Sequence, residues 1–478
     1  MNLTHAATNR AAGVLLGQAI GDALGVPYEF AAQIKPGQAR MIGGGLGPYE
    51  PGEWSDDTQM AAAIARVTAS GADLLTADGL DAVAQGFLDW QAHGATDIGA
   101  QTSGVLWAAR RGHGPLAERM TSAALGSARQ GRAGNGALMW TGIVGLVALD
   151  DRDRTAEVAR RVSALTHADD RCLDSCVLWS EAVRVAVGEG RLDLRGGLDL
   201  LPATRRARWR AIIDAAETQE PGHFTPNGFT VTAMQAAWSA IHSTRHIEGP
   251  DHVEATLQAA IAIGNDTDTV AAIAGALLGA MYGVSGLRTD YPRRVHGWPG
   301  LRSLDLIQLA LATASGGVAP QWPRQESWLS GGARRLAVPH PSDADVLLGT
   351  EADLARCAEL GVTAIVSLSR LGAVDMNGAG MAPGKHVHVW LVDTEDPAEN
   401  AHLAWTIEDA ALTVKRLRDQ GERVLLHCVA AEHRTPSVAL AYSRVLGEPL
   451  DEARGQITAL LGPIGGRLWR TANGWTEG

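Results

Sequence analysis

The chain has 478 residues, of which 46% are hydrophobic and 20% are charged. Its formal net charge at pH 7 is −12, and the sequence contains no run of basic residues. The length predicts two domains, each with a sizeable core, and the acidic balance argues against nucleic acid or an anionic membrane as the main partner. A small phosphate-bearing substrate remains compatible with this charge if local positive charge or a metal ion receives it.

The N-terminal segment and the cysteines bear on the cellular compartment. The apolar residues 11–17 are interrupted by Gln18 and Asp22, too early for an export signal or a membrane segment. Cysteine occurs at positions 172, 176, 357 and 428, without the CxxC spacing of metal sites. Cys172 and Cys176 lie one helical turn apart, which is typical of reduced core residues. We therefore expect a cytoplasmic protein.

Helical spacing of apolar residues continues from residue 11 to about 315, with little of the alternation that marks strands. We therefore predict an all-α domain over residues 1–315. Glycine recurs at every fourth position in two segments, at Gly13, Gly17, Gly21 and Gly25 and at Gly275, Gly279 and Gly283. Each such glycine costs about 1 kcal/mol relative to alanine inside a helix. The close approach of another backbone would compensate for that cost.

Two acidic clusters lie far apart in the sequence, Ser55-Asp56-Asp57-Thr58 and Asn265-Asp266-Thr267-Asp268-Thr269. Each precedes an apolar run and could be an ordinary helix N-cap. A cap needs one oxygen acceptor, however, whereas each cluster supplies two carboxylates and a hydroxyl. Four clustered carboxylates would repel one another unless hard cations lay among them, and oxygen ligands suit magnesium, calcium or manganese rather than zinc. We therefore predict one metal site built from both clusters.

Further motifs surround these clusters in chain order. They are Gly21-Asp22-Ala23-Leu24-Gly25 with Glu29, Asp97-Ile98-Gly99, Gly134-Asn135-Gly136-Ala137-Leu138-Met139 and Thr166-His167. Together with the clusters they resemble the ADP-ribosylglycohydrolase family over about residues 9–290. The resemblance implies an all-α hydrolase with two magnesium ions, manganese being the alternative metal, that cleaves the bond between C1″ of ADP-ribose and an attached group. The substrate would be an ADP-ribosylated protein or small molecule, and a nucleic acid would enter only as a modified substrate.

The resemblance also implies roles for individual residues. The metal ligands would be Ser55, Asp56, Asp57, Asp266, Asp268 and Thr269. Glu29 matches the family's gating or catalytic glutamate, and either Asp57 or Glu29 would orient or deprotonate the attacking water. The positions around the bound ADP-ribose would be Asp97, Gly99, Gly134, Asn135, Gly136 and His167.

Some of these positions have a simpler interpretation. His167 could be a buried histidine with satisfied hydrogen bonds, and residues 134–136 could be a tight turn with positive φ. The chain also departs from the family pattern twice. Ser55 replaces the usual threonine, which preserves a hydroxyl ligand, and Trp140 stands where the family commonly carries arginine, which leaves the substrate open.

Glycine and proline become frequent over residues 316–336, which predicts a linker. A second domain is expected over residues 337–478. Short apolar runs at 345–349, 364–368, 386–391 and 423–427 predict strands, and helices are expected near 351–360 and 402–419. This alternation predicts an α/β domain with a mainly parallel sheet.

The segment from His427 to Thr435 places a cysteine and an arginine in the loop between a strand and a helix, where amides and a helix N-terminus would face an anion. It resembles the phosphatase loop of the dual-specificity branch of the protein tyrosine phosphatases, over about residues 338–470. The resemblance implies that Cys428 is the thiolate nucleophile, that Arg434 holds phosphate oxygens and that Thr435 assists release of the thiolate. Asp393 would be the general acid, with Asp396 as the alternative.

This loop also departs from its family. Ala431 occupies a position where glycine is common, and alanine adopts positive φ less easily. Glu432 adds a negative charge beside the expected phosphate. The domain could therefore bind a phosphorylated substrate without turning it over. The sequence as a whole predicts a bifunctional enzyme, and the alternative is a catalytically silent module that binds ADP-ribose or senses phosphate.

Overall fold

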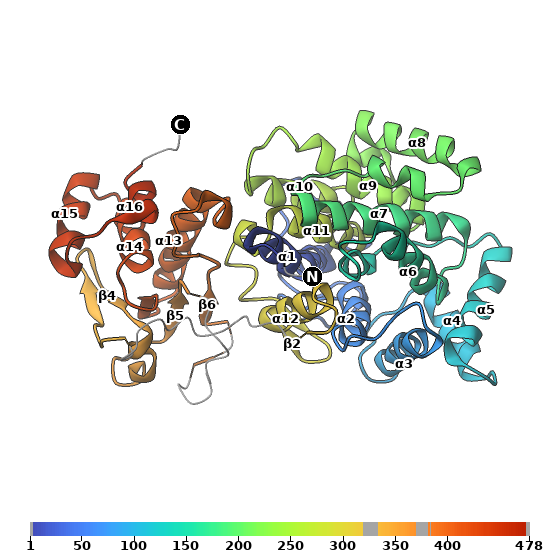
Figure 1. Cartoon of the computed structure of the whole chain (residues 1–478), viewed down its shortest axis with the longest axis horizontal. Coiled ribbons are helices and arrows are strands. Elements are labelled where there is room, and N and C mark those ends of the chain that lie inside the picture. Colours follow the sequence, from blue (N-terminus) through green and yellow to red (C-terminus); the bar gives the residue numbers. More distant parts are fainter. Residues whose placement is uncertain (1–2, 319–332, 370–380, 383, 475–478) are drawn as a thin grey trace. The chain divides into compact units, whose positions relative to one another are not determined.

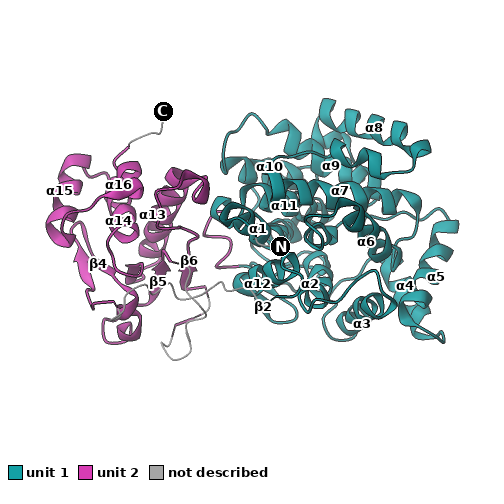
Figure 2. Cartoon of the chain, in the orientation of Figure 1, with its two compact units in different colours: residues 1–287, 295–320 teal, residues 288–294, 321–478 magenta. Residues whose placement is uncertain are grey.

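The computed structural model describes residues 3–318, 333–369, 381–382 and 384–474. They form two compact units, one within residues 1–287 and 295–320 and the other within residues 288–294 and 321–478 (Figure 2). Most of the predicted linker, residues 319–332, lies outside the described residues. Across the described ranges, no helix is both long enough and apolar enough to cross a membrane.

Unit 1 is helical, which confirms the predicted all-α class (Figure 1). Its α-helices are α1 (His5–Gly25), α2 (Asp56–Thr68), α3 (Ala77–His93), α4 (Ala100–Arg110), α5 (Leu116–Arg129), α6 (Arg152–Ala164), α7 (Asp170–Glu189), α8 (Ala203–Thr218), α9 (Thr230–Ser243), α10 (Asp251–Ala262), α11 (Thr267–Tyr282) and α12 (Ser303–Ala314). The shorter elements are the 3-10 helices η1 (Val26–Tyr28), η2 (Thr141–Leu146), η3 (Arg195–Leu200), η4 (Pro221–His223) and η5 (Val284–Gly286), and a ribbon of β1 (His296–Gly297) and β2 (Leu301–Arg302).

Helices α1 and α11 form the centre of unit 1, because both are apolar and buried around almost their whole circumference. They run antiparallel, and their glycine stripes face each other. A Cβ atom added to Gly17 would lie 2.3 Å from the carbonyl oxygen of Gly275, and one added to Gly13 would lie 2.2 Å from that of Gly279. The predicted close approach of two backbones is thus confirmed, and it brings the C-terminal end of α1 against the first turn of α11.

Unit 2 is an α/β domain with a mainly parallel sheet, as predicted. The strands are β3 (Val338–His340), β4 (Asp343–Gly349), β5 (Ala364–Ser367), β6 (His386–His388) and β7 (Val424–His427). Their order is β3-β4-β7-β5-β6, and only the β3–β4 pair is antiparallel. The helices are α13 (Leu403–Asp419), α14 (Arg434–Val445), α15 (Leu450–Leu461) and α16 (Gly466–Ala472), with the 3-10 helices η6 (Glu351–Arg356) and η7 (Pro397–Glu399).

The core of unit 2 lies on both faces of the sheet. One face of β4, β5 and β7 packs with α13 and α14, and the other face packs with a smaller apolar group around Cys357. Because both faces are buried, β5 and β7 are continuous apolar runs rather than alternating ones. The short segment 288–294 also belongs to this unit. It is held by Thr289, whose backbone N and Oγ1 donate to Asp409 Oδ2 at 2.8 and 2.7 Å.

Candidate functional site

The two acidic clusters lie at the N-termini of α2 and α11 and meet in unit 1. Carboxylate oxygens of Asp22, Asp57 and Asp268 lie within 4.8 Å of one another, and so do those of Glu29, Asp266 and Asp268. Neither Ser55 nor Asp266, the N-cap residues of α2 and α11, makes a side-chain capping hydrogen bond. The clusters therefore converge as predicted, and capping of their own helices does not account for them.

Asp22 on α1 belongs to the motif of residues 21–25, but we assigned it no role at the site from the sequence. It is fully buried, and its carboxylate accepts hydrogen bonds from the backbone N and the hydroxyl of both Ser55 and Thr58, at 2.6–3.0 Å. Asp22 thus holds the first turn of α2 in place of a local cap. Its signal in the sequence was a lone carboxylate inside an apolar helix.

The hydroxyl of Ser55, predicted as a metal ligand, lies among carboxylates. Its Oγ is 2.9 Å from Asp22 Oδ1 and 2.9 Å from Asp57 Oδ2, and its single hydrogen can be donated to only one of them at a time. Asp57 Oδ1 is buried and has no hydrogen-bond partner among the described residues. A buried anionic oxygen without a donor is what a hard cation would satisfy, so this all-oxygen set fits magnesium or manganese.

Burial and the neighbouring carboxylates raise the pKa values throughout this cluster. The pKa of Glu29 rises to about 8 and that of Asp22 to about 6, mainly because burial disfavours the charged form. The pKa values of Asp57 and Asp268 rise well above the ordinary range for the same reason, with further contributions from nearby acids. Cations placed among these groups would remove the repulsion and restore the charged form.

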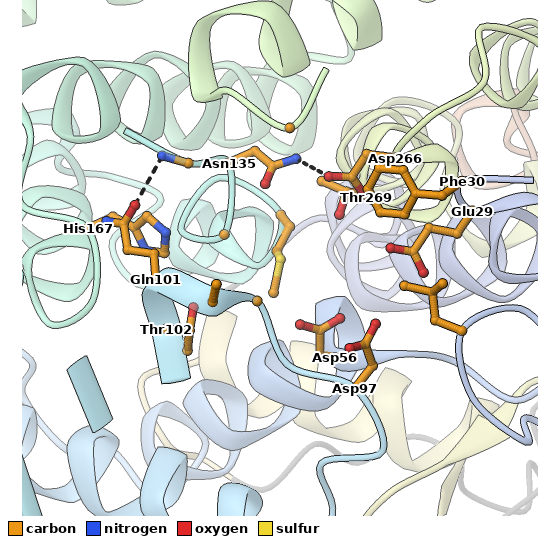
Figure 3. Close-up of a pocket in the computed structure, with 17 residues that line it drawn as sticks. Glu29, Phe30, Asp56, Asp97, Gln101, Thr102, Asn135, His167, Asp266 and Thr269 are labelled. Carbon is orange, nitrogen blue, oxygen red and sulfur yellow. Dashed lines mark hydrogen bonds between the residues drawn. The ribbon is translucent and has the colours of Figure 1, made fainter. Parts of the chain in front are cut away.

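A cavity of about 370 Å³ opens beside the cluster. Glu29, Asp56, Asp97, Asp266 and Thr269 line what we call the acidic end, whereas Gln101, Thr102, Gly134, Gly136 and His167 line the neutral end. Figure 3 shows Glu29 and Asp266 on one side of the cavity and Gln101 and His167 on the other. The predicted positions Gly99 and Asn135 also line it, and the buried Asp57 and Asp268 do not.

The loop of residues 134–136 connects the two ends of the cavity. Asn135 Nδ2 donates to Asp266 Oδ2 at 2.8 Å, and Gln101 Oε1 accepts from the backbone N of Gly134 at 3.3 Å (Figure 3). The suggestion of a turn with positive φ is wrong, because none of these residues has positive φ. Gly136 is instead required by proximity, since a Cβ atom there would lie 2.9 Å from His167 Cε1.

His167 is buried, and its Nδ1 lies 2.9 Å from Thr166 Oγ1. Burial lowers the pKa of His167 to about 4, so the ring is neutral at pH 7. A neutral ring against the glycine loop can shape the wall of the cavity without adding charge. His167 is thus a buried histidine that also lines the cavity, and its contact with ADP-ribose stays a prediction.

In unit 2, the predicted phosphatase loop runs from the end of β7 to the start of α14. Cys428, Arg434 and Thr435 are all buried, and Thr435 Oγ1 has no hydrogen-bond partner within the described residues. Asp393 approaches this loop, with His433 Nδ1 3.0 Å from its Oδ1 and Arg434 Nε 3.8 Å from its Oδ2.

Asp396, the alternative general acid, has a different environment. Its Oδ1 caps η7 by accepting from the backbone N of Ala398 at 2.9 Å. Its carboxylate thus has a structural role in the turn. The structure brings Asp393 to the loop that contains Cys428, and we keep Asp393 as the candidate general acid.

A hydrogen-bonded chain beneath the loop was not foreseen. His427 Nδ1 lies 3.1 Å from the carbonyl oxygen of Cys428, and His427 Nε2 lies 2.6 Å from Ser367 Oγ, which in turn lies 2.7 Å from His386 Nε2. Burial lowers the pKa of His427 to about 4, so its ring is neutral. Because a carbonyl only accepts, Nδ1 carries the hydrogen and Ser367 donates to Nε2. These hydrogen bonds fix the orientation of the His427 ring next to Cys428.

Comparison with known proteins identifies the first unit. A sequence model of the family described as ADP-ribosylglycohydrolase matches residues 3–320, about two thirds of the chain. The chain belongs to the ADP-ribosylglycohydrolase family. It is 29% identical over 293 residues to the ADP-ribosylarginine hydrolase Tri1 of Pseudomonas putida (strain GB-1). The aligned region covers 60% of this chain and 75% of Tri1.

A solved structure agrees with the fold of unit 1. An ADP-ribosylglycohydrolase-related protein is 24% identical, with a TM-score of 0.51 over 66% of this chain and 100% of its own. The C-terminal region matches tyrosine and dual-specificity phosphatases. One of them, human DUSP28, is 22% identical, with a TM-score of 0.23 over 29% of this chain and 90% of its own.

Trp140 is the second of the two positions at which the chain departs from the family pattern. The indole is fully buried and packs against Phe87, with the ring centroids 5.9 Å apart. Trp140 does not line the cavity. Trp140 therefore contributes to the core of unit 1 and is not part of the wall that a substrate would touch.

Ala431 adopts φ of +58°, a left-handed conformation that glycine adopts more easily than alanine. We expect Ala431→Gly to raise the free energy of unfolding of unit 2 by about 0.5–1 kcal/mol, because glycine has no Cβ atom to clash. In the matched control Ala430→Gly, at a residue without positive φ, we expect a loss of about 0.4–1 kcal/mol. Both changes in free energy are measured by unfolding the full chain in urea, with alkylation of the buried Cys357 as the signal that unit 2 has unfolded. Changes of the same sign in both variants would contradict the argument.

Proposed function

We propose that this chain is a magnesium-dependent hydrolase that releases ADP-ribose from ADP-ribosylated arginine. The observation that carries the proposal is the convergence of two acidic clusters at one end of a cavity. The cavity has an acidic end for the reaction and a neutral end for the rest of ADP-ribose. The arginine linkage is supported by the name of the relative from Pseudomonas putida, an ADP-ribosylarginine hydrolase.

Different residues of the site bind the metal, act on the water and contact ADP-ribose. Six oxygen ligands, from Ser55, Asp56, Asp57, Asp266, Asp268 and Thr269, would hold magnesium, or manganese in its place. The bound metal supplies counter-charge and polarisation at the glycosidic centre. Asp57 or Glu29 orients or deprotonates the attacking water. The loop of residues 134–136 and the Gln101 side chain, which line the neutral end, contact the remainder of ADP-ribose.

Release of ADP-ribose by the full chain tests this proposal. With magnesium we expect hydrolysis of ADP-ribosylarginine, and with a chelator a fall of roughly 100-fold or more that added magnesium or manganese restores. Serine-linked ADP-ribose and an ADP-ribosylated nucleic-acid end serve as comparison substrates. Tight binding of ADP-ribose without release from any substrate would support the silent binding module instead.

We further propose that unit 2 is a cysteine-dependent phosphatase acting on a phosphorylated substrate. The supporting observation is that Asp393 and Arg434 meet at the loop that contains the buried Cys428. Cys428 Sγ attacks phosphorus, Asp393 protonates the leaving oxygen, and water then hydrolyses the thiophosphate. Arg434 holds two phosphate oxygens, and the Thr435 hydroxyl donates to the departing thiolate. Binding of phosphate without turnover remains the alternative function.

A further inference from the structure

Two large apolar side chains line the cavity although they are open to solvent. Phe30 is 61% exposed and Leu46 is 54% exposed, whereas most large apolar side chains of unit 1 are buried. Exposed apolar groups at the mouth of a cavity gain nothing from core packing. They are typical of surfaces that contact a ligand.

Both side chains belong to the acidic end. Phe30 follows Glu29, and Figure 3 shows both side chains on the side of the cavity where Asp266 lies. The backbone N of Phe30 donates to the carbonyl oxygen of Asn265, in the second acidic cluster, at 2.7 Å. Leu46 lies between two glycines that pack on the loops leading to Glu29 and Asp97. A Cβ atom on Gly45 would lie 2.3 Å from the carbonyl oxygen of Val26, and one on Gly47 would lie 2.5 Å from Thr96 Cγ2.

The backbone of Phe30 is strained. Its φ is +48°, a conformation that a residue with a bulky side chain rarely adopts. The hydrogen bond to Asn265 holds it there, and the ring is left in solvent at the cavity mouth. The strained backbone of Phe30 places an apolar ring in solvent, so it does not improve the packing of the core. Residues with strained backbones often cluster at ligand sites.

We infer that Phe30 and Leu46 bind the group that leaves ADP-ribose, a guanidinium-bearing side chain, and so determine which linkage is cleaved. This inference rests on the proposed hydrolase function. The bond is cut at the acidic end and ADP-ribose extends toward the neutral end, so the protein that carries the modification stays outside the cavity. Only exposed residues at the acidic end can contact it. A planar cation is attracted by an aromatic face and by the carboxylate of Asp97, which lines the same end of the cavity.

Kinetics of the full chain on ADP-ribosylarginine, with saturating magnesium, test the inference. We expect Phe30→Ala to raise KM about tenfold, as for loss of a desolvated cation–π contact, and Leu46→Ala to raise it less. The inhibition constant of ADP-ribose as product should stay within about twofold of wild type, since ADP-ribose lacks the leaving group. Phe30→Tyr, which keeps the ring, should retain the wild-type KM.

The matched control is Ile42→Ala. Ile42 is also 61% exposed and belongs to the loop that precedes Leu46, but it does not line the cavity. The KM of Ile42→Ala should therefore equal that of the wild type. If the inhibition constant of ADP-ribose rises as much as KM in Phe30→Ala, Phe30 and Leu46 bind ADP-ribose itself and the inference is wrong. A KM that does not change in Phe30→Ala also overturns the inference. If Phe30→Ala melts early, Leu46→Ala provides the same test. If the wild-type protein releases ADP-ribose from none of the substrates, the proposed function and this inference are both wrong.

Discussion

Asp57→Asn and Asp268→Asn are each expected to lower magnesium-dependent release of ADP-ribose by about a thousandfold or more. Both carboxylates are buried and converge with those of neighbouring acids, and each substitution replaces an anionic oxygen ligand by a neutral amide. Magnesium should stabilise the wild-type protein against thermal unfolding and should fail to stabilise the variants. Release of ADP-ribose and melting temperature across a magnesium titration measure the two effects.

The same variants should behave differently when metal is removed. Since burial and nearby acids raise the pKa values of Asp57 and Asp268, charge at these positions destabilises the metal-free fold. In chelator, the asparagine variants should therefore melt at or above the wild-type temperature. Asp78→Asn is the matched control, because Asp78 is the second residue of α3, as Asp57 is of α2, but is exposed. Variants that melt far below wild type in chelator would identify these carboxylates as structural instead.

Cys428→Ser is expected to abolish hydrolysis of p-nitrophenyl phosphate by the full chain. A serine hydroxyl is a much weaker nucleophile than a cysteine sulfur, so the introduced serine would not replace Cys428 as the group that attacks phosphorus. Arg434→Lys should lower the rate by about tenfold to a hundredfold, because lysine cannot hold two phosphate oxygens in a planar fork. Cys357→Ser, at the other cysteine of unit 2, controls for loss of a buried thiol.

Two outcomes would reject the phosphatase function. Turnover that survives in Cys428→Ser would mean that another group attacks phosphorus. A wild-type chain that binds inorganic phosphate but releases none from p-nitrophenyl phosphate would be the phosphate-sensing module. Release of ADP-ribose should be unchanged in Cys428→Ser, since the acidic cluster and Cys428 belong to different units.

The acidic clusters and the glycine stripes could be predicted because their signals are local. Two carboxylates and a hydroxyl before an apolar run exceed what a cap requires, and glycine at every fourth position repeats on one face of a helix. The same holds for the α/β class of unit 2, since β5 and β7 are apolar runs and β7 lies between the helices α13 and α14. The predicted helix over 351–360 is instead the shorter η6, and the strand predicted over 386–391 ends at His388. Element boundaries depend on hydrogen bonds that spacing does not reveal.

Contacts between distant segments could be decided only by the tertiary structure. The hydrogen bonds of Asp22 to the start of α2, and the chain from His386 through Ser367 to His427, join residues that share no periodic pattern. The sequence by itself determined which groups must meet, because buried charge requires a counter-charge and a glycine stripe requires a neighbour. The fold decided which side chains line the cavity between them, such as Gln101, Phe30 and Leu46, because exposure and direction follow from how whole helices and loops pack.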